Sequence, residues 1–136
     1  MSLLESLDSL YKEAKESVAD IVDKPGTYEG ELISVKFDGK NKWSDGTQVP
    51  RVNLTFKVVE GDQRDNVIFV NLNLNGRTPE HRNTALSVFA NTAKKLGVDL
   101  KDKGLQDTIK DLNEQLGAKA TIEVVQNGEY LNTKVK

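Results

Sequence analysis

The chain has 136 residues, the length of a single domain, and a formal net charge of −2. It contains no cysteine, which excludes disulfide bonds and cysteine-based metal sites. No apolar run approaches the roughly 20 residues that span a bilayer, and Glu5 and Asp8 stand where a signal peptide would have a basic start. We therefore expect a cytoplasmic protein without a membrane partner.

Charge is unevenly distributed along the chain. Residues 1–24 hold three basic and six acidic residues, whereas the remaining 112 residues hold 16 basic and 15 acidic ones. The body of the chain is therefore close to neutral, with a net charge of +1. Any basic surface has to be local, and the electrostatic signal for a polyanionic partner is weak.

An amphipathic helix is predicted over residues 3–22, because apolar residues recur there at steps of three and four. Ser2 and Glu5 have the spacing of a capping box, and Pro25 disfavours helical geometry in the residue before it. We expect an N-terminal helix over 1–24 and a folded domain over 25–136. Two interpretations of the helix stay open: it packs on its own domain, or it self-associates into a homo-oligomer.

From Tyr28 onward the apolar pattern has a period of two, which is typical of strands. Strands are predicted over 28–37, over 50–59 and from residue 67. In the first strand the apolar residues change sides, and Gly30 is interpreted as the bulge where the strand switches faces. The side chains expected to point inward from the other two strands are Val52, Leu54, Phe56, Val58, Ile68, Val70, Leu72 and Leu74.

Two helices and two further strands complete the pattern. Thr78-Pro79 begins a helix that Gly97 closes, and Gly117 closes a second helix over about 105–116. Strands follow over 118–125 and 130–136, with Asn127-Gly128 as a two-residue hairpin signal. The apolar residues expected to be buried are Leu86, Phe89, Ala90, Ala93, Leu96, Leu105, Ile109, Leu112, Leu116, Ala120, Ile122 and Val124.

The predicted element order is therefore three strands, two helices and two strands. This order fits a mainly β fold with α elements, namely a five-stranded OB-fold barrel with a helical insertion between the third and fourth strands. The N-terminal amphipathic helix would precede this barrel. A two-layer α+β sheet with helices on one face fits the same order.

The third predicted strand places one aromatic residue and a series of amides on its outward side. Phe69, Asn71 and Asn73 alternate there with apolar residues. Pairing with the second strand puts Phe69 opposite Thr55 or Lys57. An aromatic ring can stack on a base of any identity, while cations and amides contact phosphates, sugars and base edges. This pattern favours a platform for single-stranded nucleic acid.

The loop between the first two strands would border the same surface in an OB-fold. The candidate nucleic-acid-binding residues are Lys36, Lys40, Lys42, Trp43, Arg51, Asn53, Lys57, Phe69, Asn71, Asn73 and Arg77. Structural alternatives stay open for the aromatic residues and the asparagines. Phe69 would be covered by the N-terminal helix, the asparagines at alternate positions (Asn71 and Asn73) would merely solvate an outer face, and Trp43 would fold back over one end of the barrel.

Three stretches of the sequence, "KPGTYEGELISVKF", "VNLTFKVVEGDQRDNVIFVNLNLN" and a helix ending in "KKLGVD", resemble a family of small phage-encoded proteins. The family was first catalogued as a domain of unknown function. Its members are interpreted as single-stranded-DNA-binding proteins of phage replication and recombination. The resemblance covers about residues 25–136. It implies an OB-fold, non-specific binding of single-stranded DNA, and replication or recombination proteins as partners in the host bacterial cytoplasm. The chain ends in "NTKVK", so docking of partners through an acidic tail is not expected.

Catalytic patterns are lacking in the sequence. His81 is the only histidine, which excludes a multi-histidine metal site, and its position suits the first turn of a helix. No glycine-rich phosphate loop occurs. We therefore expect neither an enzyme nor a cofactor or bound metal. The alternative to nucleic-acid binding is a protein-interaction module with an oligomerising N-terminal helix.

Overall fold

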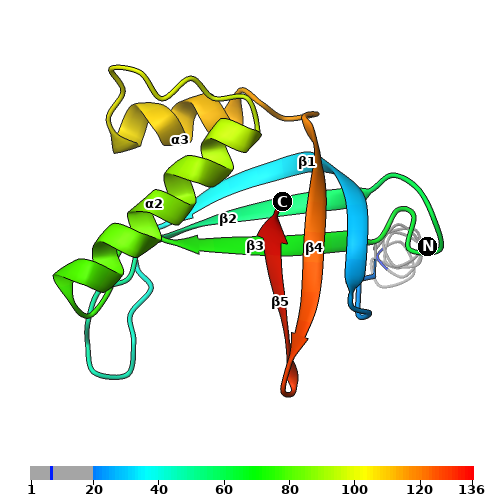
Figure 1. The fold of residues 1–136 in the computed structure, drawn as a ribbon, viewed down its shortest axis with the longest axis horizontal. Helices are drawn as coiled ribbons and strands as arrows, with labels where there is room; N and C mark the ends of the chain where they lie inside the picture. Colours follow the sequence, from blue (N-terminus) through cyan, green and yellow to red (C-terminus); the bar gives the residue numbers. More distant parts are fainter. Residues whose placement is uncertain (1–6, 8–19) are drawn as a thin grey trace.

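The computed structural model describes residue 7 and residues 20–136 (Figure 1). This part of the chain is mainly β, with five strands in one antiparallel sheet and two helices. The elements are β1 (Gly26–Asp38), β2 (Arg51–Val58), β3 (Val67–Asn73), α2 (Pro79–Lys95), α3 (Leu105–Asn113), β4 (Lys119–Asn127) and β5 (Tyr130–Val135). The predicted element order is confirmed over residues 25–136. The helix predicted over 3–22 lies outside the described residues up to residue 19, apart from residue 7.

The strands pair in the order β3-β2-β1-β4-β5, and every neighbouring pair is antiparallel. The sheet is strongly twisted, and Figure 1 shows β4 and β5 running across the direction of β2 and β3. This curvature brings the two outermost strands together. The hydroxyl of Thr133 on β5 donates a hydrogen bond of 2.6 Å to the backbone carbonyl of Phe69 on β3.

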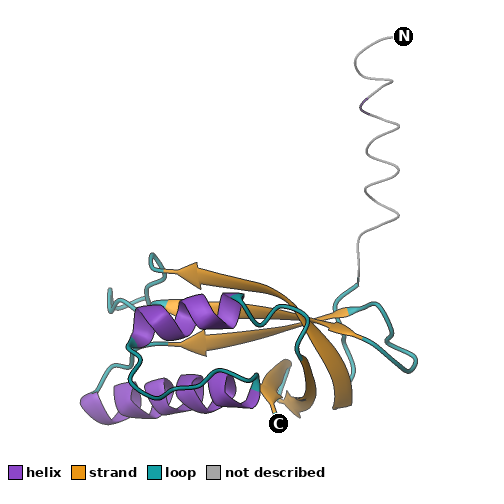
Figure 2. Cartoon of the chain, turned by 90° about the horizontal axis from the view of Figure 1, so that it is seen from above, coloured by secondary structure: helices purple, strands orange, loops and turns teal. Residues whose placement is uncertain are grey.

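The core lies between the sheet and the two helices. The apolar residues of β2 and β3 that were predicted to point inward are buried, together with Phe89, Ala93 and Leu96 from the α2 region and Leu112 from α3. Figure 2 shows α2 to one side of β1–β3, with the shorter helix α3 passing over the strands in this view. The alternation of period two therefore determined the faces of both strands correctly.

Two leucines predicted to be buried are exposed instead. Leu105 is 43% exposed and Leu116 is 51% exposed. Leu105 is the first residue of α3, and Leu116 lies beyond the last helical residue, Asn113. Because α3 has only nine residues, a single turn around Leu112 reaches the core.

Among the helices that the structure describes, none has the length and apolar composition needed to cross a membrane.

The bulge in β1 lies at a different residue from the one predicted. The register with β2 shifts between Leu32 and Ser34, so that Leu32 and Val35 both point inward while Ile33 is 43% exposed. Gly30 pairs regularly with strands on both sides. A Cβ at Gly30 would lie 3.1 Å from the Cβ of Phe56, so this glycine permits close packing rather than a bulge.

The β4–β5 hairpin also differs by one residue from the prediction. Asn127 pairs with Tyr130, so the two-residue loop consists of Gly128 and Glu129 rather than Asn127 and Gly128. Gly128 has a φ of 62°, which supplies the positive φ that such a turn requires at its first position.

Residues 20–22 are extended, whereas the sequence predicted helix up to residue 22. Val67 donates to the carbonyl of Asp20 and accepts from the amide of Val22, both at 2.9 Å, and Ile21 forms a parallel bridge to Val67. The backbone N–H and C=O of Val67 at the edge of β3 would otherwise be unpaired, and residues 20–22 provide their hydrogen-bond partners. Val22 is 5% exposed and belongs to the core.

Candidate nucleic-acid interface

The pairing of β2 with β3 aligns their outward side chains in rows. Thr55 lies opposite Phe69, Asn53 opposite Asn71, and Arg51 opposite Asn73. The row through Asn53 continues onto β1, where its partner is Lys36. We call this surface the amide face, and it consists of Lys36, Arg51, Asn53, Thr55, Phe69, Asn71 and Asn73. Of the two predicted positions for Phe69, the one opposite Thr55 is found.

The outer strand of the amide face is open to solvent. The ring of Phe69 is 42% exposed, and Asn71 and Asn73 beside it are exposed as well. Arg51 and Asn53 on the central strand are half-buried. The face therefore offers one flat apolar group at its rim and polar groups toward its middle.

Two polar atoms of the amide face are buried and have no hydrogen-bond partner in the part of the chain that the structure describes. They are Nε of Arg51 and Oδ1 of Asn53. A buried polar atom left without a partner costs about 1–3 kcal/mol, so such atoms are uncommon in folded proteins. One is a cationic donor and the other an acceptor, and both are covered by neighbouring protein atoms in this conformation.

A groove runs beside Phe69 between the edge of β3 and β5. It has a volume of about 510 Å³ and is lined by Ile21, Val22, Ile68, Phe69, Asn71, Leu131, Asn132 and Thr133. The hydrogen bond from Thr133 to Phe69 holds its two walls together. The residues that β5 contributes are not among the candidates predicted from sequence, because contact between β3 and β5 depends on the curvature of the whole sheet.

The loop between β1 and β2 forms a small hairpin of its own. Lys42 pairs with Gln48, and the amide of Trp43 donates to the carbonyl of Thr47 at 3.0 Å. Lys40 and Lys42 are exposed on this loop, and Trp43 is half-buried. Figure 1 shows this loop and the β4–β5 turn both projecting beyond the edge of β3 on the same side.

Arg77 connects this loop to the segment between β3 and α2. Its guanidinium lies 4.8 Å from the centroid of the Trp43 ring, and its Nε lies 3.1 Å from Oδ2 of Asp45. Nearby, Nδ2 of Asn75 donates to the carbonyl of Gln48 at 2.7 Å. We call Trp43, Asp45 and Arg77 the Trp43 cluster. The structure thus pairs Trp43 and Arg77 with each other.

Asp45 is held in its charged form within the Trp43 cluster. Hydrogen bonds from the backbone and side chain of Thr47 lower the pKa of Asp45 below its ordinary value, and the charge of Arg77 acts in the same direction. Asp45 was not selected from the sequence, because an aspartate in a Gly-rich loop is already explained by turn formation.

Lys57 lies two residues beyond Thr55 on the same outward side of β2, at the end of the strand away from Arg51. It is opposite Val67 at the start of β3, and its Nζ lies 3.6 Å from Oδ1 of Asp65. Both side chains are exposed, so this ion pair is weak. The carboxylate nevertheless offsets the positive charge that a phosphate would contact there.

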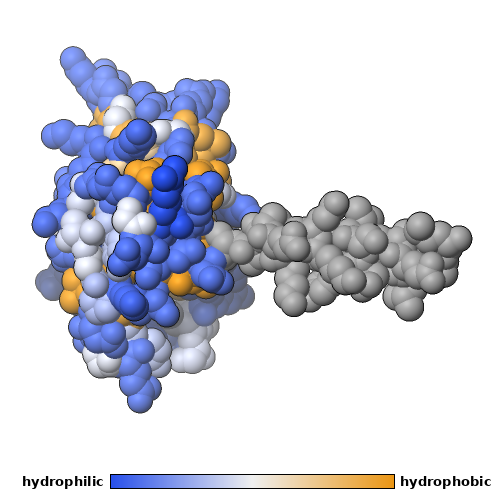
Figure 3. Space-filling model, turned by 90° about the vertical axis from the view of Figure 1, so that its right-hand side faces the viewer, coloured by the Kyte–Doolittle hydropathy of each residue, from blue (hydrophilic) through white to orange (hydrophobic). Residues whose placement is uncertain are grey.

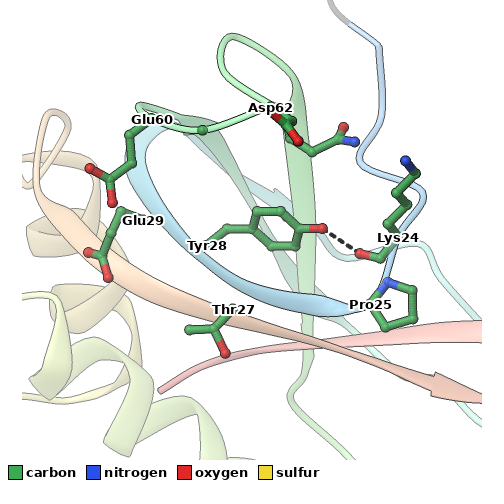
Figure 4. Close-up of a pocket in the computed structure, with 9 residues that line it drawn as sticks. Lys24, Pro25, Thr27, Tyr28, Glu29, Glu60 and Asp62 are labelled. Carbon is green, nitrogen blue, oxygen red and sulfur yellow. Dashed lines mark hydrogen bonds between the residues drawn. The ribbon is translucent and has the colours of Figure 1, made fainter.

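A second pocket, of about 380 Å³, lies at the beginning of β1, at the end of this strand away from the Trp43 loop (Figure 4). The hydroxyl of Tyr28 donates to the carbonyl of Lys24 at 2.7 Å in this pocket. Glu29, Glu60 and Asp62 surround it. Three carboxylates repel a phosphate backbone, which makes this pocket unsuitable for nucleic acid.

Figure 3 shows that the side of the molecule on the right of Figure 1 is largely hydrophilic, with small separate apolar patches.

No protein-family model and no curated protein matches the sequence. The choice among functions therefore depends on the geometry and chemistry of the surfaces described above.

Proposed function

We propose that the chain binds single-stranded DNA without catalysis, through stacking on Phe69 and polar contacts from the rest of the amide face. The observation that carries this proposal is the row register, which sets an exposed aromatic ring opposite Thr55 and beside exposed amides, with Asn53 and Arg51 in the next two rows. Stacking on an aromatic side chain contributes about 1–3 kcal/mol per base and tolerates any base. The amides supply hydrogen bonds to sugar, phosphate or base edges.

The polar side chains of the inner strands support this proposal. Arg51 places a guanidinium, and Asn53 an amide, in the middle of the amide face, where both side chains are half-buried. Lys36, at the far end of the row through Asn53, adds an exposed cation. Since the net charge of the chain is −2, we expect few phosphate contacts and a modest dependence of affinity on salt.

We infer further that the five strands form an OB-fold. The pairing order β3-β2-β1-β4-β5 and the position of both helices between β3 and β4 support this assignment. The hydrogen bond between Thr133 and Phe69 supports it as well, because the two outermost strands of the sheet, β3 and β5, approach each other when a sheet curves into a barrel. In that fold the β2–β3 surface and the adjacent loops bind oligonucleotides.

The resemblance to small phage-encoded proteins supports a biological role for this binding. The chain would coat single strands during phage or prophage replication or recombination in the cytoplasm of the bacterial host. It would act with other replication or recombination proteins and would require no cofactor.

The direct test is a titration of fluorescently labelled oligo-dT with the full chain, followed by fluorescence anisotropy at two salt concentrations. We expect binding that strengthens with oligonucleotide length and weakens modestly with salt. A duplex of the same length should bind more weakly, because its bases are already stacked. Absence of oligo-dT binding at low salt would refute the proposal.

A second candidate function has one observation in its favour. Phe37 on β1 and Leu105 on α3 are 55% and 43% exposed. Together with Gln106 and Ile109 they line an apolar groove of about 350 Å³. Adjacent exposed apolar groups are typical of protein–protein contacts. A protein-interaction module would bind no oligo-dT, and Leu105→Ser would reduce its self-association in sedimentation velocity experiments.

A further inference from the structure

The outward row of β5 repeats the chemistry of the outward row of β3. On β3, Phe69 is followed by Asn71 and Asn73 at alternate positions. On β5, Tyr130 is followed by Asn132 and Lys134, again at alternate positions. The intervening residues Leu131, Thr133 and Val135 are more buried than their neighbours, so the two sets lie on opposite faces of the strand.

Tyr130 is 76% exposed, more than any other large hydrophobic residue in the described part of the chain. It lies at the β4–β5 turn, opposite Asn127. Its hydroxyl explains some of this exposure, but its position beside two amides matches that of Phe69. The combination of one exposed ring and adjacent amides therefore occurs twice in the structure.

The two rows meet at the groove between β3 and β5. Asn132 lines this groove together with Phe69 and Asn71. Thr133, the next residue of β5, bonds to the carbonyl of Phe69 and fixes the crossing point of the strands. A nucleic-acid strand that runs from the ring of Phe69 through the groove would therefore pass Asn132 before it reaches Tyr130.

We infer that β5 carries a second contact strip for single-stranded nucleic acid, with Tyr130 as a base-stacking platform and Asn132 as a polar contact between the two rings. This inference rests on the function proposed above and extends the bound strand beyond the amide face. Phosphate contacts contribute little on this strip. Lys134 is paired with Glu123 at 3.4 Å, and Glu129 precedes Tyr130 in the turn.

The test compares Tyr130→Ala with Tyr130→Phe in the full chain, using labelled oligo-dT of about 15 nucleotides, near the upper limit for one OB-fold. Loss of one stacked base predicts a loss of affinity of about 5- to 150-fold for Tyr130→Ala. Tyr130→Phe keeps the ring and should bind as tightly as the wild type. The dependence of affinity on salt should be the same in all three proteins, because no phosphate contact is removed.

Leu116→Ala is the matched control, because it also shortens an exposed apolar side chain but lies between α3 and β4. It should leave affinity unchanged. Equal affinities for Tyr130→Ala and the wild type would overturn the inference, as would an equal loss in Tyr130→Phe. If the wild type binds oligo-dT and Phe69→Ala weakens binding while Tyr130→Ala does not, only the second strip is refuted. If the wild type does not bind, the proposed function itself fails.

Discussion

Thr133 and Phe69 are 64 residues apart in sequence, yet the hydroxyl of Thr133 bonds to the backbone carbonyl of Phe69 at 2.6 Å. These two residues lie on the outermost strands of the sheet, which do not pair with each other through a regular ladder. A side-chain hydrogen bond thus joins the two ends of the sheet at the candidate stacking residue.

Thr133→Val should lower the free energy of unfolding by about 0.5–1.5 kcal/mol, the usual net contribution of one hydrogen bond. Valine keeps the shape of threonine but cannot donate to the Phe69 carbonyl. Urea unfolding followed by circular dichroism measures the change. Thr27→Val, at an exposed position of β1, serves as the control. Equal losses in both variants would mean that the β3–β5 bond does not stabilise the fold.

Phe69→Ala should weaken binding to oligo-dT by about 1–3 kcal/mol at every salt concentration, because it removes a stacking surface and no charge. Since the ring is 42% exposed, the midpoint of thermal unfolding should change little. Fluorescence anisotropy and a thermal melt measure the two effects. A large loss of stability with unchanged binding per folded molecule would show that the ring is a packing residue.

Lys36→Ala should flatten the slope of log K against log salt by about 0.7, the value for one phosphate contact with a single strand. Lys110→Ala, on the exposed side of α3, should leave the slope unchanged. Lys57→Ala should change it less than Lys36→Ala, because Asp65 offsets its charge. A larger effect at Lys57 would place the nucleic acid at the other end of β2.

Protonation of Asp45 should alter the environment of Trp43, the only tryptophan. The pKa of Asp45 in the folded protein lies below its ordinary value of 3.8, so its charged form is favoured by folding. The resulting stabilisation is present above pH 3.8 and is lost as the pH falls through the lowered pKa. Tryptophan emission should change in that acidic range, and Asp45→Asn should remove this component. An identical pH profile in the variant would exclude Asp45 as the cause.

Val22→Ala should lower the free energy of unfolding by about 2 kcal/mol, because two buried carbon groups are lost and a small cavity remains. Deletion of residues 1–19 should leave the sheet intact, whereas deletion of 1–22 should destabilise it. The second deletion removes Val22 and the backbone bonds to Val67. Urea unfolding of the two truncated chains distinguishes them, and equal stabilities would show that this segment contributes nothing to the fold.

Local patterns made most elements predictable. Alternation in β2 and β3 specifies the faces, since a shift by one residue would expose every apolar side chain. The start of α2 was also clear from the sequence, and the hydroxyl of Thr78 indeed accepts from the amide of His81 at 3.1 Å. The amide face followed from the alternation in β2 and β3, because adjacent antiparallel strands with a short turn can pair in few ways.

The remaining features depend on contacts between distant segments. The apolar pattern predicts a bulge at Gly30, whereas the pairing of β1 with β2 places the register shift between Leu32 and Ser34. Arg77 and Trp43 are 34 positions apart and meet because two loops end at the same edge of the sheet. The contribution of β5 to the groove requires the curvature of the complete sheet, which no local pattern encodes.

The attachment of residues 20–22 to Val67 has a consequence for solubility. An exposed strand edge can pair with the edge of another molecule and lead to aggregation. The N-terminal segment covers the beginning of the β3 edge, and Thr133 occupies the carbonyl of Phe69 just beyond it. This protection should allow the chain to stay dispersed at high concentration, and substitutions that weaken it should increase the tendency to form intermolecular β-sheet before they unfold the core.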